Sequence, residues 1–369
     1  MNESDFISKP YSKTLEKGSV AWQSPSNIAL VKYWGKYGEQ LPKNPSISFT
    51  LDNCNTTTEL KFQKKVMSSD TFDFEVYFEG KISEDFKPKI ETFFDRVEKY
   101  LPFLKDYTFE IHTSNTFPHS SGIASSASGM SALALCLVDL EKLLLNDVVT
   151  LSAVEGSLIK KASFIARLGS GSACRSIEGD LVVWGEHSEI RGSSNLFGIN
   201  YPHKVHNNFK NYQDTILLVD KGEKQVSSSV GHNLMHDHPF SEERFKQAND
   251  NLSKLIFVFE SGNLSKFIKI VESEALSLHA MMMTSMPYFI LMKPNTLEII
   301  NKIWSYRNET NSNICFTLDA GANVHVLYPE KEKEEVLEFI KNELVAYCQN
   351  GQYICDQIGF GAKQLTISN

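Results

Sequence analysis

The spacing of apolar residues predicts both strands and helices in the first half of the chain. Apolar side chains two residues apart recur over Phe72–Phe78 and Tyr107–Ile111, the pattern of half-buried strands. From Met130 to Leu144 the apolar steps are three and four residues, which predicts a helix with one buried face. A second helix is expected over 151–168, ended by Gly169. The first half therefore combines strands with helices that can cover them.

The second half shows the same mixture after a polar stretch at 195–210. Strands and helices in both halves predict the α+β class. The polar stretch is the best place for a boundary, so we expect two domains, 1–205 and 206–369. In the second we expect strands at 216–219, 314–318 and 324–327, a helix around 335–344, and a helix with Asn295 as N-cap and Leu297, Ile300 and Trp304 facing inward.

Composition narrows the class of protein. The chain has 369 residues, of which 41% are apolar and 22% charged, as in folded globular proteins. Its net charge of −8 argues against nucleic-acid and anionic-membrane partners. The longest apolar run, 132–138, is far shorter than the ~20 residues that span a bilayer, and the acidic N-terminus is unlike a secretory signal. Six scattered cysteines predict reduced, buried thiols and a cytoplasmic protein, not a disulfide framework or zinc site.

A serine-rich loop at 115–127 follows one predicted strand and opens the helix that contains Leu133. Small residues in such a loop leave backbone N–H groups and the positive end of the helix free to bind phosphate. An ordinary serine-rich helix cap fits the local pattern equally well. A Walker A loop and a Rossmann glycine fingerprint are both missing from the sequence, so neither of those nucleotide sites is expected.

Three other segments contain charged residues in unusual places. Lys32 interrupts an apolar run, so it either lies at the edge of a strand or pairs with a buried acid. Arg175 follows a pair of glycines near a short helix, where it can bind a carboxylate or phosphate through two hydrogen bonds. A surface arginine paired with a neighbouring acid is the commoner alternative. Asp319 ends a strand before a turn, which is commonplace in itself.

Taken together, these segments resemble the diphosphomevalonate decarboxylase family, a branch of the superfamily of galactose, homoserine, mevalonate and phosphomevalonate kinases. The likeness extends from about Ala21 to Leu365. It implies an α+β fold with an N-terminal domain like domain 2 of ribosomal protein S5, a ferredoxin-like C-terminal domain and a cleft between them. The motifs that carry it are Asn27-Ile-Ala-Leu-Val-Lys-Tyr-Trp-Gly-Lys36, Pro118-His-Ser-Ser-Gly-Ile-Ala-Ser-Ser126, Gly169-Ser-Gly-Ser-Ala-Cys-Arg-Ser176 and Asp319-Ala-Gly-Ala-Asn323.

The resemblance implies a reaction and three catalytic residues. The family converts mevalonate 5-diphosphate and ATP into isopentenyl diphosphate, ADP, phosphate and carbon dioxide, through phosphorylation of the 3-hydroxyl. Asp319 matches the acid near that hydroxyl, where a carboxylate of ordinary pKa accepts the proton late in the transfer. Lys32 matches a lysine beside it, placed to neutralise charge. Arg175 matches the arginine that binds the C1 carboxylate, and we expect it to act mainly by positioning.

The same motifs imply the binding residues and cofactors, which are ATP and Mg²⁺. Mg²⁺ is expected on the ATP phosphates, with Ser126 the one protein hydroxyl considered as an additional contact. Relatives are commonly homodimers, and no feature of the sequence decides that point. The resemblance assigns substrate binding to Asn27, Tyr33, Lys36, Ser170, Ser172 and Arg175, and ATP binding to Ser120, Ser121, Gly122, Ser125 and Ser126.

Departures from the family pattern leave alternatives open. Ala322 stands where the family usually has proline, and Pro45 replaces a serine. A mevalonate 3-kinase or a decarboxylase of the monophosphate shares this framework, and release of carbon dioxide with ADP distinguishes a decarboxylase from the kinase. A non-catalytic sensor is disfavoured because the acid and the lysine are both present. His119 and His325 are expected to be packing or surface residues and not ligands.

Overall fold

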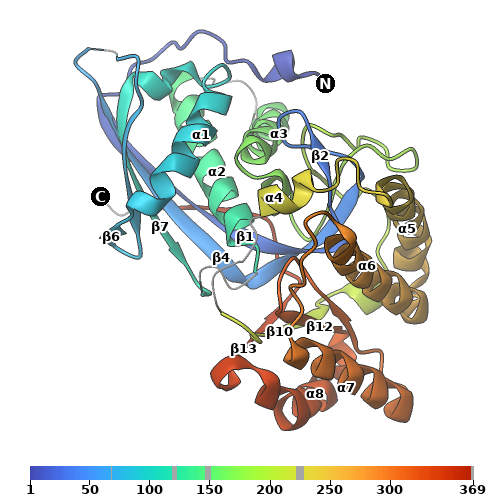
Figure 1. Cartoon of the computed structure of the whole chain (residues 1–369). Helices are drawn as coiled ribbons and strands as arrows, with labels where there is room; N and C mark the ends of the chain where they lie inside the picture. The colour runs from blue at the N-terminus through green and yellow to red at the C-terminus, as the bar shows by residue number, and fades with distance from the viewer. Residues whose placement is uncertain (68, 119–122, 146–150, 222–227, 367–369) are drawn as a thin grey trace.

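The computed structural model describes residues 1–67, 69–118, 123–145, 151–221 and 228–366. Within them the chain is an α+β protein with one large and one small sheet, as Figure 1 shows. The predicted fold class is therefore confirmed. Among the described residues, no helix is long and apolar enough to cross a membrane. All six cysteines are free thiols, and only Cys355 is exposed.

The large sheet is built on two long antiparallel strands, β1 and β4, which pair along most of their length. Its main strand order is β14-β1-β4-β7-β5-β6, and β8 with β9 continues from β4. All pairings are antiparallel except that of β5 with β7. The strands are β1 (Lys17–Val31), β4 (Ser46–Lys64), β5 (Asp73–Phe78), β6 (Lys81–Ile82), β7 (Tyr107–Asn115), β8 (Leu181–Trp184), β9 (Ile199–Asn200) and β14 (Lys363–Leu365); β2 (Lys36–Tyr37) and β3 (Leu41–Pro42) form a separate hairpin.

Three helices cover one face of this sheet: α1 (Lys87–Val97), α2 (Ser125–Leu145) and α3 (Leu151–Gly169). The stripe predicted from Met130 to Leu144 is buried, and it packs in one core with Leu60 and Phe62 of β4. The predicted end of the second helix at Gly169 is also confirmed. The serine-rich loop thus connects β7 to α2, as its position in the sequence indicates.

The small sheet has the order β11-β12-β10-β13, and all its pairs are antiparallel. Helices lie between β10 and β11 and between β12 and β13, so the topology is the βαββαβ arrangement of a ferredoxin-like domain. The elements are β10 (Gln213–Leu217), α4 (Ser228–Asn233), α5 (Ser241–Ser261), α6 (Leu264–Thr284), α7 (Pro294–Thr310), β11 (Cys315–Thr317), β12 (Val324–Tyr328), α8 (Lys333–Phe339) and β13 (Tyr353–Gln357).

The two faces of the small sheet pack against different partners. Leu217 and Phe316 join the core formed with α7 and α8. Their neighbours Ile216 and Cys315 point the other way, into a core shared with α5, α6 and the long strands of the large sheet. The strand β14 then returns to pair with β1. The two halves therefore share one core, and the boundary after residue 205 stays a prediction.

Some predicted elements differ from the observed ones. Leu297 was expected to face inward but is 48% exposed, because α7 buries the stripe that contains Ile299, Ile300 and Ile303. That helix begins at Pro294, with Lys293 and not Asn295 as N-cap. The strand expected at 216–219 is observed as β10, Gln213–Leu217, so it starts and ends earlier. Its first three residues are buried but polar, so the apolar pattern did not reveal them. The last predicted helix is α8 extended by a π-helical turn, Ile340–Leu344.

Candidate active site

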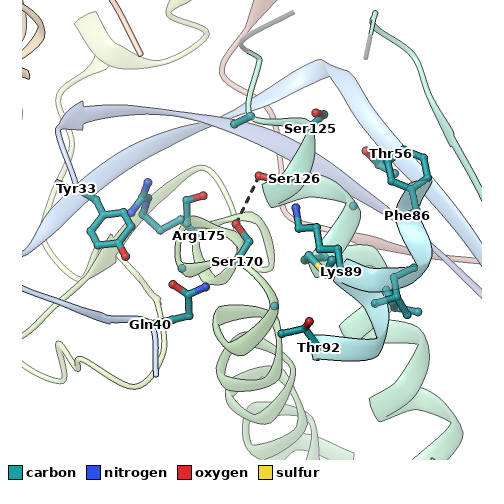
Figure 2. A pocket seen from close by; sticks show the side chains of 18 of the residues that line it. Tyr33, Gln40, Thr56, Phe86, Lys89, Thr92, Ser125, Ser126, Ser170 and Arg175 are labelled. Carbon is teal, nitrogen blue, oxygen red and sulfur yellow. Dashed lines mark hydrogen bonds between the residues drawn. The ribbon is translucent and has the colours of Figure 1, made fainter. Parts of the chain in front are cut away.

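A cavity of about 800 Å³ lies where the two halves of the chain meet. Its walls come from the end of β1, from α1, from the start of α2 and from the 3₁₀ helix η4 (Gly171–Ser176). Asp319, which follows β11, closes it from the second half. Figure 2 shows Tyr33, Ser126, Ser170, Lys89 and Arg175 arranged around this space.

Lys32 and Asp319 form an ion pair at the edge of the cavity, with 2.9 Å between Nζ and Oδ1. The lysine side chain is 2% exposed and the aspartate side chain 30%. Burial lowers the pKa of Lys32 below its ordinary value, and the carboxylate of Asp319 opposes that shift. Of the two sequence interpretations, pairing with an acid is the observed one. The acid keeps one side open to the cavity.

The backbone of Lys32 is held by buried side chains from both halves of the chain. Its N–H donates to Glu274 Oε2 at 2.9 Å, and its carbonyl accepts from Asn44 Nδ2 at 2.9 Å. Glu274 itself accepts from Arg244 Nη2 at 2.5 Å and from Asn251 Nδ2 at 2.6 Å. Sequence reasoning missed Glu274 and Arg244. The only signal was a charged residue on the apolar face of each amphipathic helix.

A histidine on α6 holds the other member of the pair. His279 Nε2 lies 3.1 Å from the carbonyl oxygen of Asp319. Burial lowers the pKa of His279 to about 4, so the ring is neutral at pH 7 and donates its Nε2–H to that oxygen. The helix α6 therefore contacts Lys32 through Glu274 and Asp319 through His279.

Arg175 is buried in η4 and bound by hydroxyl groups. Its Nε donates to Ser48 Oγ at 2.6 Å, and its Nη1 donates to Ser46 Oγ at 2.7 Å. The alternative of a surface arginine paired with an acid is wrong here, because the residue is 3% exposed and its hydrogen-bond partners are neutral. Neutral partners fix the orientation of the guanidinium and leave its charge available to an anion in the cavity.

Tyr33 lines the cavity (Figure 2), and its buried hydroxyl has no hydrogen-bond partner among the described residues. Gly171 allows this position, since a Cβ there would come within 2.9 Å of the tyrosine oxygen. Buried polar atoms are nearly always hydrogen-bonded, so this hydroxyl is a candidate to bind an oxygen that reaches this part of the cavity. Ser170, Ser172 and Lys36 line the same space.

Asn27 lies behind the cavity wall. Its Nδ2 donates to Ser176 Oγ at 2.7 Å and to the Ser172 carbonyl at 3.3 Å. It therefore fastens η4, the element that carries Arg175. Asn27 would therefore act on a ligand through η4 and not by direct contact.

The N-terminus of α2 also lines the cavity, next to Ser170. Ser125 and Ser126 are the first residues of that helix, and Ser126 Oγ is 3.5 Å from Ser170 Oγ (Figure 2). The predicted ATP-binding residues Ser120, Ser121 and Gly122 lie outside the described residues, as does His119.

Sequence reasoning missed two cations on α1, Lys89 and Arg96, which also line the cavity. Burial and the neighbouring Arg96 lower the pKa of Lys36, so two cations face one region of the cavity. Such a region favours anions. The signal was present, because Lys89, Thr92 and Arg96 are three and four residues apart and share one face of α1.

Comparison with known proteins decides the family. A diphosphomevalonate decarboxylase-like N-terminal domain model matches residues 24–195, and a mevalonate 5-diphosphate decarboxylase C-terminal domain model matches residues 215–364. This chain belongs to the diphosphomevalonate decarboxylase family. The diphosphomevalonate decarboxylase of Ganoderma lucidum is 28% identical over 92% of this chain and 84% of its own length.

Solved structures of the family share the whole fold. The structure of MDDEF in complex with MVAPP, AMPPCP and magnesium has a TM-score of 0.79 and 27% identity, covering 95% of this chain and 100% of that one. A mevalonate diphosphate decarboxylase from Legionella pneumophila has a TM-score of 0.73 and 28% identity, covering 91% and 100%. The two-domain architecture expected from the resemblance is therefore confirmed.

The site fits a magnesium ion carried by nucleotide phosphates. In the described part of the chain, no group of three or more His, Cys, Asp or Glu side chains is placed to hold a metal. The hydroxyls of Ser125 and Ser126 at a helix N-terminus, with Lys89 nearby, instead suit the oxygens of a polyphosphate.

The departures from the family pattern leave the cavity intact. Ala322 is buried, and its carbonyl accepts from Thr296 Oγ1 at 2.7 Å. His325 is buried in β12, where Nδ1 lies 2.7 Å from Asp214 Oδ2. Its prediction as a packing residue is confirmed by this position in the small sheet.

Proposed function

We propose that this protein catalyses the ATP-dependent decarboxylation of mevalonate 5-diphosphate to isopentenyl diphosphate, with release of ADP, phosphate and carbon dioxide. The observation that carries the proposal is the Lys32–Asp319 pair, which lines one cavity together with Arg175 and the start of α2. A carboxylate, a guanidinium and a phosphate-binding helix end are the groups that this reaction requires.

Asp319 is the proposed acceptor of the 3-hydroxyl proton. Its carboxylate cannot remove that proton in advance, because the pKa of a tertiary alcohol is far above that of a carboxyl group. It orients the hydroxyl oxygen and takes the proton late, as the phosphoryl group is transferred. His279 holds its backbone during this step.

Lys32 holds Asp319 ionised and places a positive charge beside the oxygen that receives the phosphoryl group. Its ammonium is buried, so this charge acts in a region of low dielectric constant, where it is worth more than in water. Mg²⁺, when bound with ATP, neutralises charge on the phosphates.

Arg175 is proposed to position the C1 carboxylate. That carboxylate must lose its charge into the new double bond as carbon dioxide leaves. Strong stabilisation of the carboxylate would oppose this step, because it would lower the ground state more than the transition state. The fixed guanidinium is therefore best placed to align the leaving carboxylate with the 3-phosphate.

The remaining residues are proposed to bind the diphosphate of the substrate and the phosphates of ATP. Tyr33, Lys36, Ser170 and Ser172 line the cavity around the unpaired tyrosine hydroxyl and suit the substrate diphosphate. Ser125 and Ser126 suit the ATP phosphates. We further propose that the chain divides at 1–205 and 206–369, and that it acts in the cytoplasm, where its buried free thiols stay reduced.

The experiment is a coupled assay of ADP release with mevalonate, its 5-phosphate and its 5-diphosphate, each with analysis of the products. We expect carbon dioxide and ADP in equal amounts with the diphosphate. ADP without carbon dioxide would identify a 3-kinase. Greater activity with the monophosphate would move the substrate assignment to that compound.

A further inference from the structure

The segment 32–36 carries Lys32, Tyr33 and Lys36, three of the proposed site residues, yet most of it lies outside the strands. It connects β1 to the short hairpin β2–β3. Without the hydrogen bonds of a sheet, its shape depends on the side chains packed around it. Glu274 and Asn44 hold its first residue, as described above.

The other end of the segment is held by His232 of α4. The backbone N–H of Gly35 donates to His232 Nδ1 at 3.0 Å. The imidazole also packs on Tyr33, with 4.1 Å between ring centroids, and on Trp34, with 4.7 Å. The helix α4 also approaches Trp34 closely at Gly231, where a Cβ would come within 2.5 Å of the Trp34 ring. His232 itself lines the cavity.

The hydrogen bond from Gly35 determines the state of the ring. An amide N–H can only donate, so Nδ1 carries no proton and the proton of the neutral ring is on Nε2. Burial, with the nearby cations Lys36 and Arg175, lowers the pKa of His232 to about 3. The ring therefore stays neutral while it lies among cations that an anionic substrate would contact.

We propose that His232 is a positioning residue for the substrate diphosphate: by accepting from Gly35 and packing on Tyr33, it places the Tyr33 hydroxyl and the Lys36 ammonium for that group. The proposal rests on the proposed function. His232 lies on α4, in the second half of the chain. It thus controls how tightly Tyr33 and Lys36, in the first half, bind the diphosphate.

Three variants of His232 and one control test the two contacts. In His232→Asn the amide oxygen can replace Nδ1 as acceptor. In His232→Gln the amide reaches the place of Nε2 instead. His232→Phe keeps a ring against Tyr33 and Trp34 but removes the acceptor. His236→Asn, at an exposed histidine in the turn after α4, is the control. Michaelis constants for both substrates, kcat and the thermal midpoint are measured for each.

We expect His232→Phe and His232→Gln to raise the KM for mevalonate 5-diphosphate about tenfold, as the loss of one buried acceptor implies. Their KM for ATP and their kcat should change less than threefold. His232→Asn should keep the KM for the diphosphate within threefold of wild type. His236→Asn should match wild type throughout.

An unchanged KM for the diphosphate in both His232→Phe and His232→Gln would overturn the proposal, as would equal rises in the KM of both substrates. Equal losses in the Asn and Gln variants would also overturn it, because an acceptor at the place of Nδ1 would then make no difference. If His232→Phe does not fold, the Asn and Gln pair decides alone. A wild-type enzyme without carbon dioxide release would instead refute the proposed function, whatever the variants do.

Discussion

At the scale of single residues, the site is a set of charges with different kinds of partner. Lys32 is paired with a carboxylate that opens to the cavity, whereas Arg175 is held by two serine hydroxyls. The first arrangement neutralises a buried charge within the protein. The second leaves a buried charge to be neutralised by a ligand. This difference fits a proton acceptor at one position and an anion-binding group at the other.

Replacement of Asp319 by Asn should abolish most of the activity. The amide cannot accept the hydroxyl proton, and Lys32 loses its ionic partner. We expect kcat to fall by about 10²–10⁴-fold, the usual contribution of a positioned acid or base. The measurement is carbon dioxide release at saturating substrate, with the exposed Asp237→Asn as control. A kcat within threefold of wild type would remove Asp319 from the mechanism.

Replacement of Arg175 by Gln should affect substrate binding as well as turnover. The guanidinium is placed to align a carboxylate, and its loss also removes the hydrogen bonds that it donates to the Ser46 and Ser48 hydroxyls. We expect the KM for mevalonate 5-diphosphate to rise about tenfold, with a larger fall in kcat. Steady-state kinetics test this against Arg191→Gln, an exposed arginine. An unchanged KM for mevalonate 5-diphosphate would contradict a positioning role.

At the scale of elements, α5 and α6 hold the catalytic pair from behind. Glu274 of α6 binds the backbone of Lys32 and the side chain of Arg244 of α5, and all of these groups are buried. A buried pair of this kind gives little net stability, but removal of one partner leaves an uncompensated charge. The helices thus set the position of β1 at its end, next to the cavity.

Replacement of Glu274 by Gln should therefore destabilise the protein by about 3 kcal/mol. The additional change Arg244→Met should recover part of that loss, because it removes the charge left unpaired. Chemical denaturation measures both variants, with Glu298→Gln on the exposed side of α7 as control. If the double variant is as unstable as the single one, the ion pair is not the cause.

At the scale of the whole molecule, stability should fall in mild acid. Burial lowers the pKa of His232 to about 3 and that of His279 to about 4, against an ordinary value of 6.5. Below pH 6.5 the unfolded chain binds protons that the folded protein does not, which favours unfolding. The free energy of unfolding should decrease from pH 6.5 to pH 4 by about 3 kcal/mol for each histidine.

The measurement is the free energy of unfolding from pH 8 to pH 4, for wild type and for His232→Asn. The variant lacks one of the two titrating groups, so its stability should depend less steeply on pH. Parallel curves for the two proteins would show that His232 does not titrate differently in the folded and unfolded states.

Much of the fold and part of the site were predictable because they depend on local order along the chain. The helix from Met130 to Leu144 and the strand from Tyr107 to Ile111 have apolar periods that only one element satisfies. Lys32 also stands out in the sequence, since charged residues rarely interrupt apolar segments without a partner, whereas Arg175 and Asp319 stand out only through the motifs around them.

Only the tertiary structure decided which of these residues meet. Glu274, His279 and His232 reach the segments of Lys32 and Asp319 across gaps in sequence of 242, 40 and 197 residues, and no local pattern encodes such contacts. Packing also decided which face of α7 is buried. The helix packs against the small sheet through Ile299, Ile300 and Ile303, and this leaves Leu297 exposed. Periodicity records which face of an element is buried, whereas the partner of a buried polar group is determined by how the elements pack together.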